Sequence, residues 1–196
     1  MKQDEIRRAM IDGTIHVVAR DGLDKATTKL LAAEAGVNEA YIYRFFDGKE
    51  DMLVKTFTTL DLELSGKILE CMPAMANSNI SIENRCWMLF SCVWNFLLCN
   101  SEKCLCFIRY YYSPYFIKYS SKEHKEMYQT VVEKIQPAFK EGADVWMLLN
   151  YILDVMLAYS IRVFNGELAN DAKTAEYVYN LVYSGVESQL SWSKKS

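Results

Sequence analysis

The residues from Thr27 to Lys55 read TTKLLAAEAGVNEAYIYRFFDGKEDMLVK, and this stretch decides the fold. Two short segments with apolar residues at helical spacing lie on either side of Gly36. Thr27 and Asn38 precede the two segments, and each can cap a helix by accepting a backbone N–H of its first turn. Gly36 stands where a helix end needs a residue in the left-handed conformation. The stretch therefore predicts a helix, a tight turn and a second helix, followed by a longer helix from Lys49.

A helix–turn–helix of this kind places its second helix in the major groove of DNA. The same spacing also fits an ordinary helical hairpin on the surface of a bundle. On the second segment, Ile42, Phe45 and Phe46 fall on one side, which leaves the opposite side free to meet DNA. We expect the small Ala40 to let that helix approach the base edges. Small residues in the first segment and the turn, Ala32 and Gly36, are expected to let the two helices pack closely.

Seven residues are the candidate DNA contacts. Phosphate contacts are expected from Thr28, Lys29, Tyr43 and Lys49. Base-edge contacts are expected from Tyr41 and Arg44, beside Ala40. The charge of this part of the chain is unusual for a nucleic-acid-binding segment. From Met1 to Phe57 there are nine Lys and Arg residues against ten Asp and Glu residues, so we expect few phosphate contacts per protomer and a need for dimerisation.

The order and spacing of about ten residues in this stretch resemble the tetracycline-repressor-like (TetR) family. The matching residues are Thr27-Thr28, Leu31-Ala32, Ala35-Gly36-Val37, Tyr43, Phe46 and Lys49. The resemblance covers roughly residues 5–57, and the rest of the chain resembles the family only in length and helical character. Arg44 occupies a position that varies in the family, and Asp47 replaces a residue that is frequently basic there.

The resemblance implies a homodimeric transcriptional repressor that binds double-stranded operator DNA. In such a protein a small molecule bound in the C-terminal domain favours a spacing of the two recognition helices that does not fit the operator. The resemblance also implies that the last two helices form a four-helix dimer interface. The alternative function is a helical dimeric protein-interaction module without sequence-specific DNA binding.

Composition and charge are consistent with a globular protein of the cytoplasm. The chain has 196 residues, 51% of them hydrophobic, and a net charge of −3. No apolar run reaches the length of about 18 residues that a membrane span needs, so we expect no membrane partner. The first ten residues lack the apolar core of a signal peptide. The six cysteines are therefore expected to be reduced.

The sequence predicts an all-α fold with an N-terminal three-helix DNA-binding domain, residues 1–48, and a larger helical ligand-binding and dimerisation domain, residues 49–196. Further helices are predicted wherever apolar residues recur at helical spacing between Gly, Pro and Asn breaks. Their ranges are about 4–20, 49–72, 82–100, 102–112, 122–140, 143–164 and 171–190, with 115–121 predicted as a loop.

The last two predicted helices are the candidate dimer interface. Residues 143–164 are apolar on almost every face, and a helix of that kind is buried on all sides. Burial inside a single protomer would also explain this pattern. The interface residues expected on the final helix are Tyr177, Val178, Leu181 and Gly185.

Aromatic residues are concentrated in the middle of the chain, and a pocket between helices is commonly lined by such residues. Core packing would explain most of them equally well. The predicted pocket, for a mostly apolar or aromatic effector, comprises Trp94, Phe107, Tyr111, Trp146, Tyr151 and Asp154. Asp154 favours a cationic ligand and Arg109 an anionic one, so the charge of the ligand stays open. Asn95 and Asn150 are further polar candidates, either for the pocket or for the dimer interface.

Signs of other chemistry are weak. His16 and His124 have no ligand-like spacing, and the sequence contains no common cofactor or metal motif. Cys104 and Cys106 have the spacing of a metal or redox site, but free cysteine on a helix is usually a small buried hydrophobe. We therefore expect no enzyme activity, no cofactor and no metal. A pocket that places His124 beside a cysteine or carboxylate would revive the enzyme hypothesis.

Overall fold

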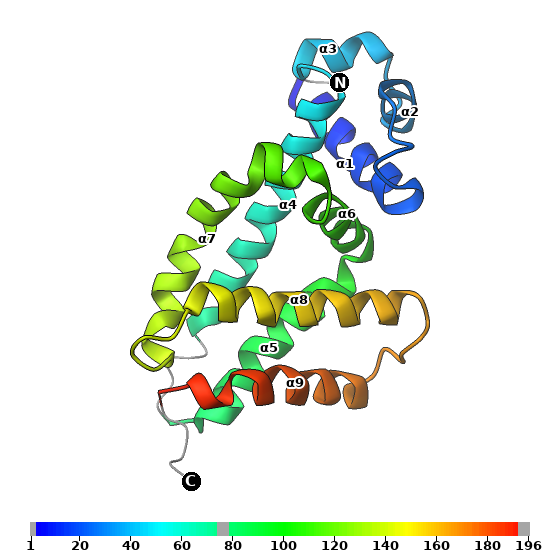
Figure 1. Cartoon of the computed structure of the whole chain (residues 1–196). Helices are drawn as coiled ribbons and strands as arrows, with labels where there is room; N and C mark the ends of the chain where they lie inside the picture. Colours follow the sequence, from blue (N-terminus) through cyan, green and yellow to red (C-terminus); the bar gives the residue numbers. More distant parts are fainter. Residues whose placement is uncertain (1–2, 74–78, 192–196) are drawn as a thin grey trace. The chain divides into compact units, whose positions relative to one another are not determined.

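The computed structural model describes residues 3–73 and 79–191, and this part of the chain is helical apart from turns and one isolated bridge between Phe139 and Leu190. The predicted all-α fold is confirmed (Figure 1). The α-helices are α1 (Gln3–Asp21), α2 (Thr28–Glu34), α3 (Ile42–Phe45), α4 (Lys49–Cys71), α5 (Ile82–Cys99), α6 (Ser101–Tyr111), α7 (Ser121–Ile135), α8 (Val145–Phe164) and α9 (Ala172–Val186). Short 3₁₀ or π-helical turns are η1 (Glu39–Tyr41), η3 (Phe116–Ser120), η4 (Gln136–Ala138) and η5 (Glu187–Gln189).

The chain divides into two compact units. Unit 1 comprises residues 1–64 and 102–125, and unit 2 comprises residues 65–101 and 126–196. Helices α4 and α7 each contribute residues to both units. The predicted boundary between residues 48 and 49 remains a prediction, because these units group residues by contact and not by function.

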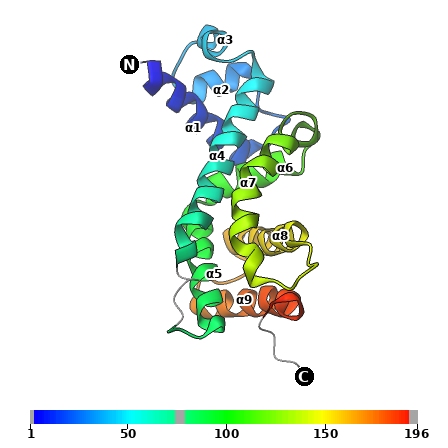
Figure 2. The same ribbon diagram turned by 90° about the vertical axis from the view of Figure 1, so that its left-hand side faces the viewer.

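In unit 1, the helix–turn–helix forms as its capping residues predict. The Thr27 hydroxyl accepts the Leu30 N–H at 3.3 Å, and the Asn38 side chain accepts the Ala40 N–H at 2.9 Å. Gly36 has a φ of 67°, the left-handed conformation that ends α2. The second helix begins as the 3₁₀ turn η1 before it continues as α3. Figures 1 and 2 show α1, α2 and α3 gathered around the first turns of α4.

Close helix packing in unit 1 depends on Gly13 and not on Gly36. A Cβ added to Gly13 would lie 3.1 Å from the backbone nitrogen of Ala35, so α1 and the end of α2 approach closely there. A Cβ added to Gly36 would meet nothing within 4 Å, so Gly36 is needed only for its backbone conformation. The prediction that Gly36 allows close packing is therefore wrong. Ala32 is buried, as that prediction required.

An aromatic cluster fills the interior of unit 1 on the other side of α4. The Phe57 ring is stacked 4.6 Å from Tyr110 and 5.1 Å from Phe107, and the Phe116 ring meets it edge-on at 5.5 Å. Phe116 belongs to η3, where the Ser121 N–H bonds the Phe116 carbonyl across a π-helical turn. The predicted loop at 115–121 is therefore wrong. The segment is ordered because Phe116 is buried and Tyr110 and Ser120 share a hydrogen bond of 2.9 Å.

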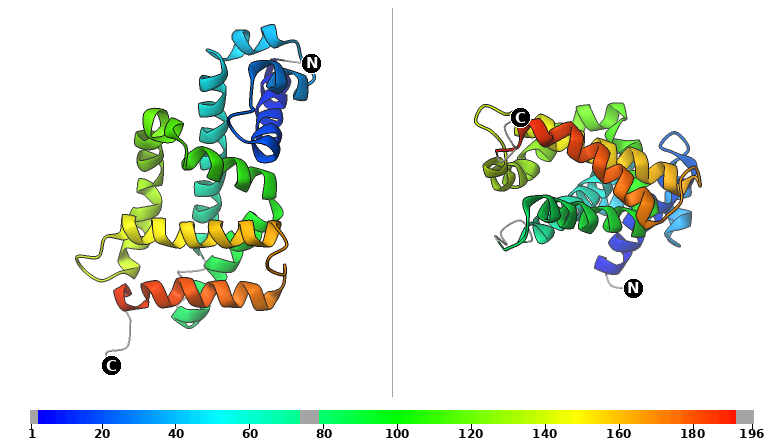
Figure 3. Two further views of the ribbon diagram at one scale, coloured as in Figure 1. Left: turned by 45° about the vertical axis from the view of Figure 1, so that its right-hand side comes forward. Right: turned by 90° about the horizontal axis from the view of Figure 1, so that it is seen from below.

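In unit 2, α8 and α9 run side by side in opposite directions, and α5 contacts both (Figure 3). Helix α8 is long and apolar enough, by length and composition alone, to cross a membrane, a test that core helices also pass. Only 28% of its most apolar window is buried within the protomer. Much of its apolar surface is therefore left uncovered by unit 2.

A disulfide joins α4 to α5 in unit 2. Cys71 and Cys92 are bonded with their Cα atoms 6.2 Å apart, so the prediction that all six cysteines are reduced is wrong for this pair. The two residues face each other across adjacent helices, which spacing along the sequence does not reveal. Cys86, Cys99, Cys104 and Cys106 are free thiols.

The ends of α7 and α9 meet at one side of unit 2. Helix α7 ends at Ile135, before the predicted end at about residue 140, because Pro137 interrupts the helical hydrogen bonds. Phe139 and Leu190 pair in the isolated bridge and are buried together with Val145 and Val186. The Lys140 N–H donates to the Gln189 carbonyl at 2.8 Å. These contacts hold the C-terminal turn η5 against the segment after α7.

Candidate nucleic-acid interface and ligand cavity

The outer side of η1 and α3 presents most of the predicted base-reading residues. Tyr43 is 67% exposed, and Ala40 and Arg44 are exposed as well. Tyr41 is half-buried because its ring stacks on Phe45 at 6.4 Å. The Arg44 guanidinium lies 5.8 Å from the centre of the same Phe45 ring, a cation–π contact that positions it. This surface therefore offers one cation and two phenols from a single turn of helix.

The predicted phosphate contacts differ in how free their polar atoms are. Lys29 is exposed at the start of α2. The Thr28 hydroxyl donates to the Glu39 carboxylate, and the Lys49 ammonium donates to the Leu23 carbonyl at 3.1 Å. Thr28 and Lys49 thus each hold a neighbouring segment in place. Contact with DNA from these two residues would have to share or replace those bonds.

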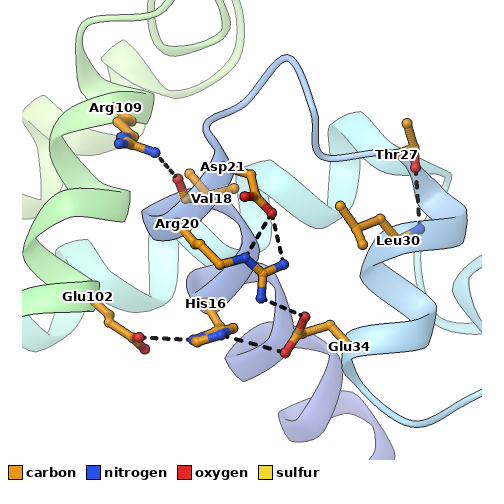
Figure 4. Close-up of polar contacts among 9 residues, drawn as sticks. All are labelled: His16, Val18, Arg20, Asp21, Thr27, Leu30, Glu34, Glu102 and Arg109. Carbon is orange, nitrogen blue, oxygen red and sulfur yellow. Dashed lines mark hydrogen bonds and ion pairs between the residues drawn. The ribbon is translucent and has the colours of Figure 1, made fainter.

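Ionic and hydrogen-bonded contacts connect α1 to α2 and α6 within unit 1 (Figure 4). His16 lies 2.9 Å from Glu102 of α6 and 3.7 Å from Glu34 of α2. Arg20 contacts Asp21 at 2.8 Å and Glu34 at 3.3 Å. The hydrogen bond from Arg20 lowers the pKa of the Asp21 carboxyl. Side chains of α1 therefore connect the helix–turn–helix to α6.

Arg109, predicted as a possible ligand contact, belongs to this same set of contacts. Its guanidinium donates to the Val18 carbonyl near the end of α1 at 2.6 Å (Figure 4). Arg109 lies in unit 1 and does not line the cavity described below. It therefore gives no support for an anionic ligand.

The six predicted pocket residues are not brought together. Phe107 and Tyr111 belong to the aromatic cluster of unit 1, where Tyr111 lies 4.4 Å from Phe116. Trp94, Trp146, Tyr151 and Asp154 belong to unit 2. Trp94 is buried against Phe90, whereas Asp154 is exposed and is not the buried carboxylate that the prediction required. Asn95 is exposed too, and the Asn150 amide bonds the Trp146 carbonyl one turn earlier.

A cavity of about 610 Å³ lies within unit 2, and none of those six residues lines it. That volume is in the range of about 300–1,000 Å³ that is typical of small-molecule sites. The ends of α4 and α7 and the helices α5, α8 and α9 form its walls. Most lining side chains are aliphatic, and the polar ones are Arg85, Cys86, Lys134, Tyr179 and Tyr183. Sequence reasoning missed this site because branched aliphatic residues look alike whether they line a cavity or fill a core.

Burial affects the polar groups in the walls of the cavity. Burial raises the pKa of the Cys86 thiol to about 11, even though the nearby Arg85 charge opposes that shift. Burial likewise raises the pKa of Tyr183. The Tyr179 hydroxyl donates to the Glu83 carbonyl at 3.0 Å, so its polar end is already occupied. An apolar ligand would therefore meet few unsatisfied polar groups.

The predicted dimer residues on α9 differ in exposure. Tyr177 is 60% exposed, whereas Val178 is completely buried within the protomer, so its burial does not need a partner. Leu181 is half-buried, and its carbonyl accepts the Tyr151 hydroxyl at 3.2 Å. A Cβ on Gly185 would overlap the ring of Tyr151. Gly185 and Leu181 thus help to seat Tyr151 within the same protomer.

The remaining candidates for other chemistry are buried. His124 lies 2.8 Å from Asp61, beside a carboxylate, but their side chains are only 6% and 1% exposed and neither lines the cavity of unit 2. Cys104 and Cys106 are buried, and burial raises the pKa of Cys106 to about 12. Within residues 3–73 and 79–191, no three His, Cys, Asp or Glu side chains gather in a geometry that could hold a metal ion.

Comparison with known proteins agrees with this geometry. Residues 10–56 match the model of a family described as bacterial regulatory proteins, tetR family. The HTH-type transcriptional regulator BetI of Vibrio parahaemolyticus is 35% identical over 77 residues, 37% of this chain. That match spans 39% of the length of BetI.

Solved structures show the same fold over nearly the whole chain. A putative tetR family transcription regulator from Shewanella has a TM-score of 0.75 at 17% identity and covers 94% of this chain and 98% of its own. A TetR family regulator from Marinobacter aquaeolei has a TM-score of 0.71 at 16% identity, with 94% and 97% covered. The regulator FadR from Bacillus subtilis, in complex with stearoyl-CoA, has a TM-score of 0.69 at 20% identity, with 91% and 98% covered. The helix–turn–helix segment of this chain therefore matches the tetR family of bacterial regulatory proteins in sequence, and its helical fold is that of the solved TetR family regulators.

Proposed function

We propose that the protein is a cytoplasmic, DNA-binding transcriptional regulator that represses its target and releases the operator when a small molecule binds unit 2. The observation that carries this proposal is the exposed surface of η1 and α3. Tyr43 and Arg44 project there from a capped, glycine-terminated helix–turn–helix, within the segment that matches the family model. An arginine on such a helix can form a bidentate contact with guanine in the major groove.

The proposed DNA-binding form is a homodimer through α8 and α9. Exposed residues recur on α8 at Met147, Tyr151, Asp154 and Ala158, which is the three-to-four spacing of one helix face. Tyr177 adds an exposed aromatic side chain on α9. A face of this kind is covered in a four-helix interface of two protomers. Two recognition helices about 34–36 Å apart would then meet successive major grooves.

Dimerisation would also compensate for the unfavourable charge of the DNA-binding segment. With nine basic and ten acidic residues up to Phe57, one segment offers few favourable phosphate contacts. Two linked segments gain from each other, because the second binding step takes place at a high effective concentration.

The proposed effector site is the cavity of unit 2. Its volume and apolar walls support a ligand site, and FadR, a structure of similar fold, holds stearoyl-CoA. A ligand that binds only one of two conformations shifts the protein toward that conformation and changes its affinity for DNA. Helix α4 begins beside the helix–turn–helix and ends in the cavity wall, so it supplies a covalent connection between the two sites.

The test is binding of the purified protein to the DNA upstream of its own gene, measured by gel shift and footprinting. We expect a protected region with two half-sites and a solution mass twice the 22.7 kDa of one chain. Arg44→Ala should lose the footprint at one base position of each half-site, while Lys125→Ala, at an exposed position of α7, should not. A protein that binds no DNA in a genome-wide selection of fragments, but captures a protein partner through α3, would favour the protein-interaction alternative.

A further inference from the structure

We propose that the ligand of the unit 2 cavity is an anionic amphiphile, with an apolar chain between the aliphatic walls and a negative head group at Arg85 and Lys134. This inference rests on the proposed function and specifies the chemical class of the effector. The sequence alone leaves the charge of the effector open, because Asp154 favours a cationic ligand and Arg109 an anionic one. Both of those residues lie outside the cavity, so the charge of the ligand is inferred from the residues that line the cavity.

The walls favour a flexible chain over a flat aromatic molecule. Side chains such as Leu69, Leu89 and Ile152 come from three different helices, and the lining rings of Phe90 and Tyr179 meet edge-on, with 61° between their planes. Contact between branched aliphatic walls and the methylene groups of a ligand buries apolar surface and so favours binding. Each methylene group that is buried improves affinity about fourfold. Affinity should therefore rise with chain length until the cavity is filled.

The charged residues that line the cavity are all cationic. Arg85 is half-buried on α5, and Lys134 is exposed near the end of α7. The carboxylates closest to the lining tyrosines, those of Glu83 and Glu187, belong to exposed residues that are not part of the lining. A charged head group in contact with this lining therefore meets positive charge, and a carboxylate or phosphate is the complementary partner.

Arg85 acts on the cavity wall and not only on solvent. Its charge is felt by the neighbouring Cys86 thiol, which is itself part of the lining. A guanidinium in a partly dry setting interacts more strongly with an anion than it would in water. Arg85 is therefore the residue expected to distinguish an anionic head from a neutral one of the same chain length.

The test compares four probes with the same twelve-carbon chain, each used below its micellar concentration. They are laurate, dodecanol, dodecylammonium and lauroyl coenzyme A. Binding is followed by tryptophan fluorescence, because Trp94 stacks on the lining residue Phe90 at 5.8 Å and Trp87 meets Tyr179 at 5.1 Å. We expect one or both anionic probes to bind about tenfold or more tightly than dodecanol, and dodecylammonium to bind weakest. The relative affinity of laurate and the coenzyme A thioester distinguishes a free carboxylate from a phosphate-bearing head.

Variants assign the head-group site. Arg85→Gln should reduce the preference for the anionic probe over dodecanol by about tenfold and leave dodecanol binding unchanged. Lys134→Gln should reduce it less, because its ammonium is solvated. Lys173→Gln, an exposed cation of unit 2 outside the lining, is the matched control and should change nothing. Because the dodecanol affinity is measured for every variant, a variant with a damaged fold is recognised by loss of both ligands.

Equal affinity for laurate, lauroyl coenzyme A and dodecanol, or a preference for dodecylammonium, would overturn the inference while DNA binding and its release stay intact. Absence of DNA binding in every condition would instead overturn the proposed function, and the fluorescence titration would still report the ligand preference of the cavity.

Discussion

The two compact units have interiors of opposite construction. Around Phe57 in unit 1, buried aromatic rings pack against one another, stacked or edge-on, with their centres 4.6–5.5 Å apart. Around Leu153 in unit 2, aliphatic side chains from several helices leave a cavity of about 610 Å³. The aromatic residues Phe107 and Tyr111, which were predicted to line a pocket, therefore belong to a packed ring cluster. The space that suits a ligand lies where aliphatic helix faces and helix ends meet.

The largest expected effect is the loss of a ring from the filled interior. Phe57→Ala should lower the free energy of unfolding by about 3–5 kcal/mol, because Phe57 is 2% exposed and its neighbours cannot close the gap. Leu153→Ala at the cavity of unit 2 should cost less, since part of its surroundings is already empty. Urea denaturation of both variants measures the difference, and an equal or larger loss for Leu153→Ala would show that unit 2 is packed as tightly as unit 1.

The disulfide of unit 2 should be the next largest contribution. Replacing Cys71 and Cys92 by serine should lower the stability of the oxidised protein by about 3 kcal/mol, because the bond closes a loop with a sequence separation of 21 residues. Cys99→Ser, at an exposed free thiol, is the control. Denaturation is measured with and without reductant. The parent and the double variant should have the same stability only under reducing conditions. If reductant leaves the parent unchanged, the bond does not form in solution.

Substitutions on the DNA-reading surface should change the affinity for DNA without changing the packing of either unit. Arg44→Ala should reduce discrimination at one base position by about 1–3 kcal/mol. Lys29→Ala should weaken binding to all DNA sequences alike and lower the slope of log affinity against log salt concentration by about 1. Lys49→Ala should also weaken binding, but it removes the bond to the Leu23 carbonyl as well, so its melting temperature must be measured beside it. Anisotropy titrations with sets of mutated operator DNA at several salt concentrations separate these effects.

The smallest expected effects come from a matched pair of enlargements. Ile152→Phe places extra carbon atoms at the unit 2 cavity and should stabilise the protein by about 0.5–2 kcal/mol. Ile42→Phe makes the same change at a fully buried position of unit 1 and should cost about 1–3 kcal/mol. Opposite signs in thermal unfolding would support the contrast between the two interiors. If both substitutions change the stability in the same direction, the contrast between the two interiors is contradicted.

The parts of the molecule that the sequence predicted are those that local chemistry determines. Thr27 and Asn38 cap their helices through bonds two or three residues away, and Gly36 ends α2 through its own backbone angle. The all-α fold is confirmed, and the predicted resemblance of this stretch to the tetR family is matched by the family model over residues 10–56. The DNA contacts assigned to Tyr43, Arg44 and their neighbours remain predictions.

The parts that sequence reasoning missed depend on contacts between distant segments. The disulfide between Cys71 and Cys92 requires two helices to face each other, and the order of the 115–121 segment depends on Tyr110 and Ser120 meeting across η3. The cavity is the clearest case. Its lining comes from five helices, and nothing in the identity of a single Leu or Ile shows that the space beside it is empty.

The measurement that tests the account most directly is a single titration that follows cavity occupancy and DNA release together. Tryptophan fluorescence near Phe90 would report the ligand, and anisotropy of labelled upstream DNA would report the operator, while laurate or lauroyl coenzyme A is added. The account predicts that both signals change at the same ligand concentration in the parent, and that Arg85→Gln moves both to higher concentration together. Occupancy of the cavity that leaves the DNA bound, or DNA release without occupancy, would contradict it.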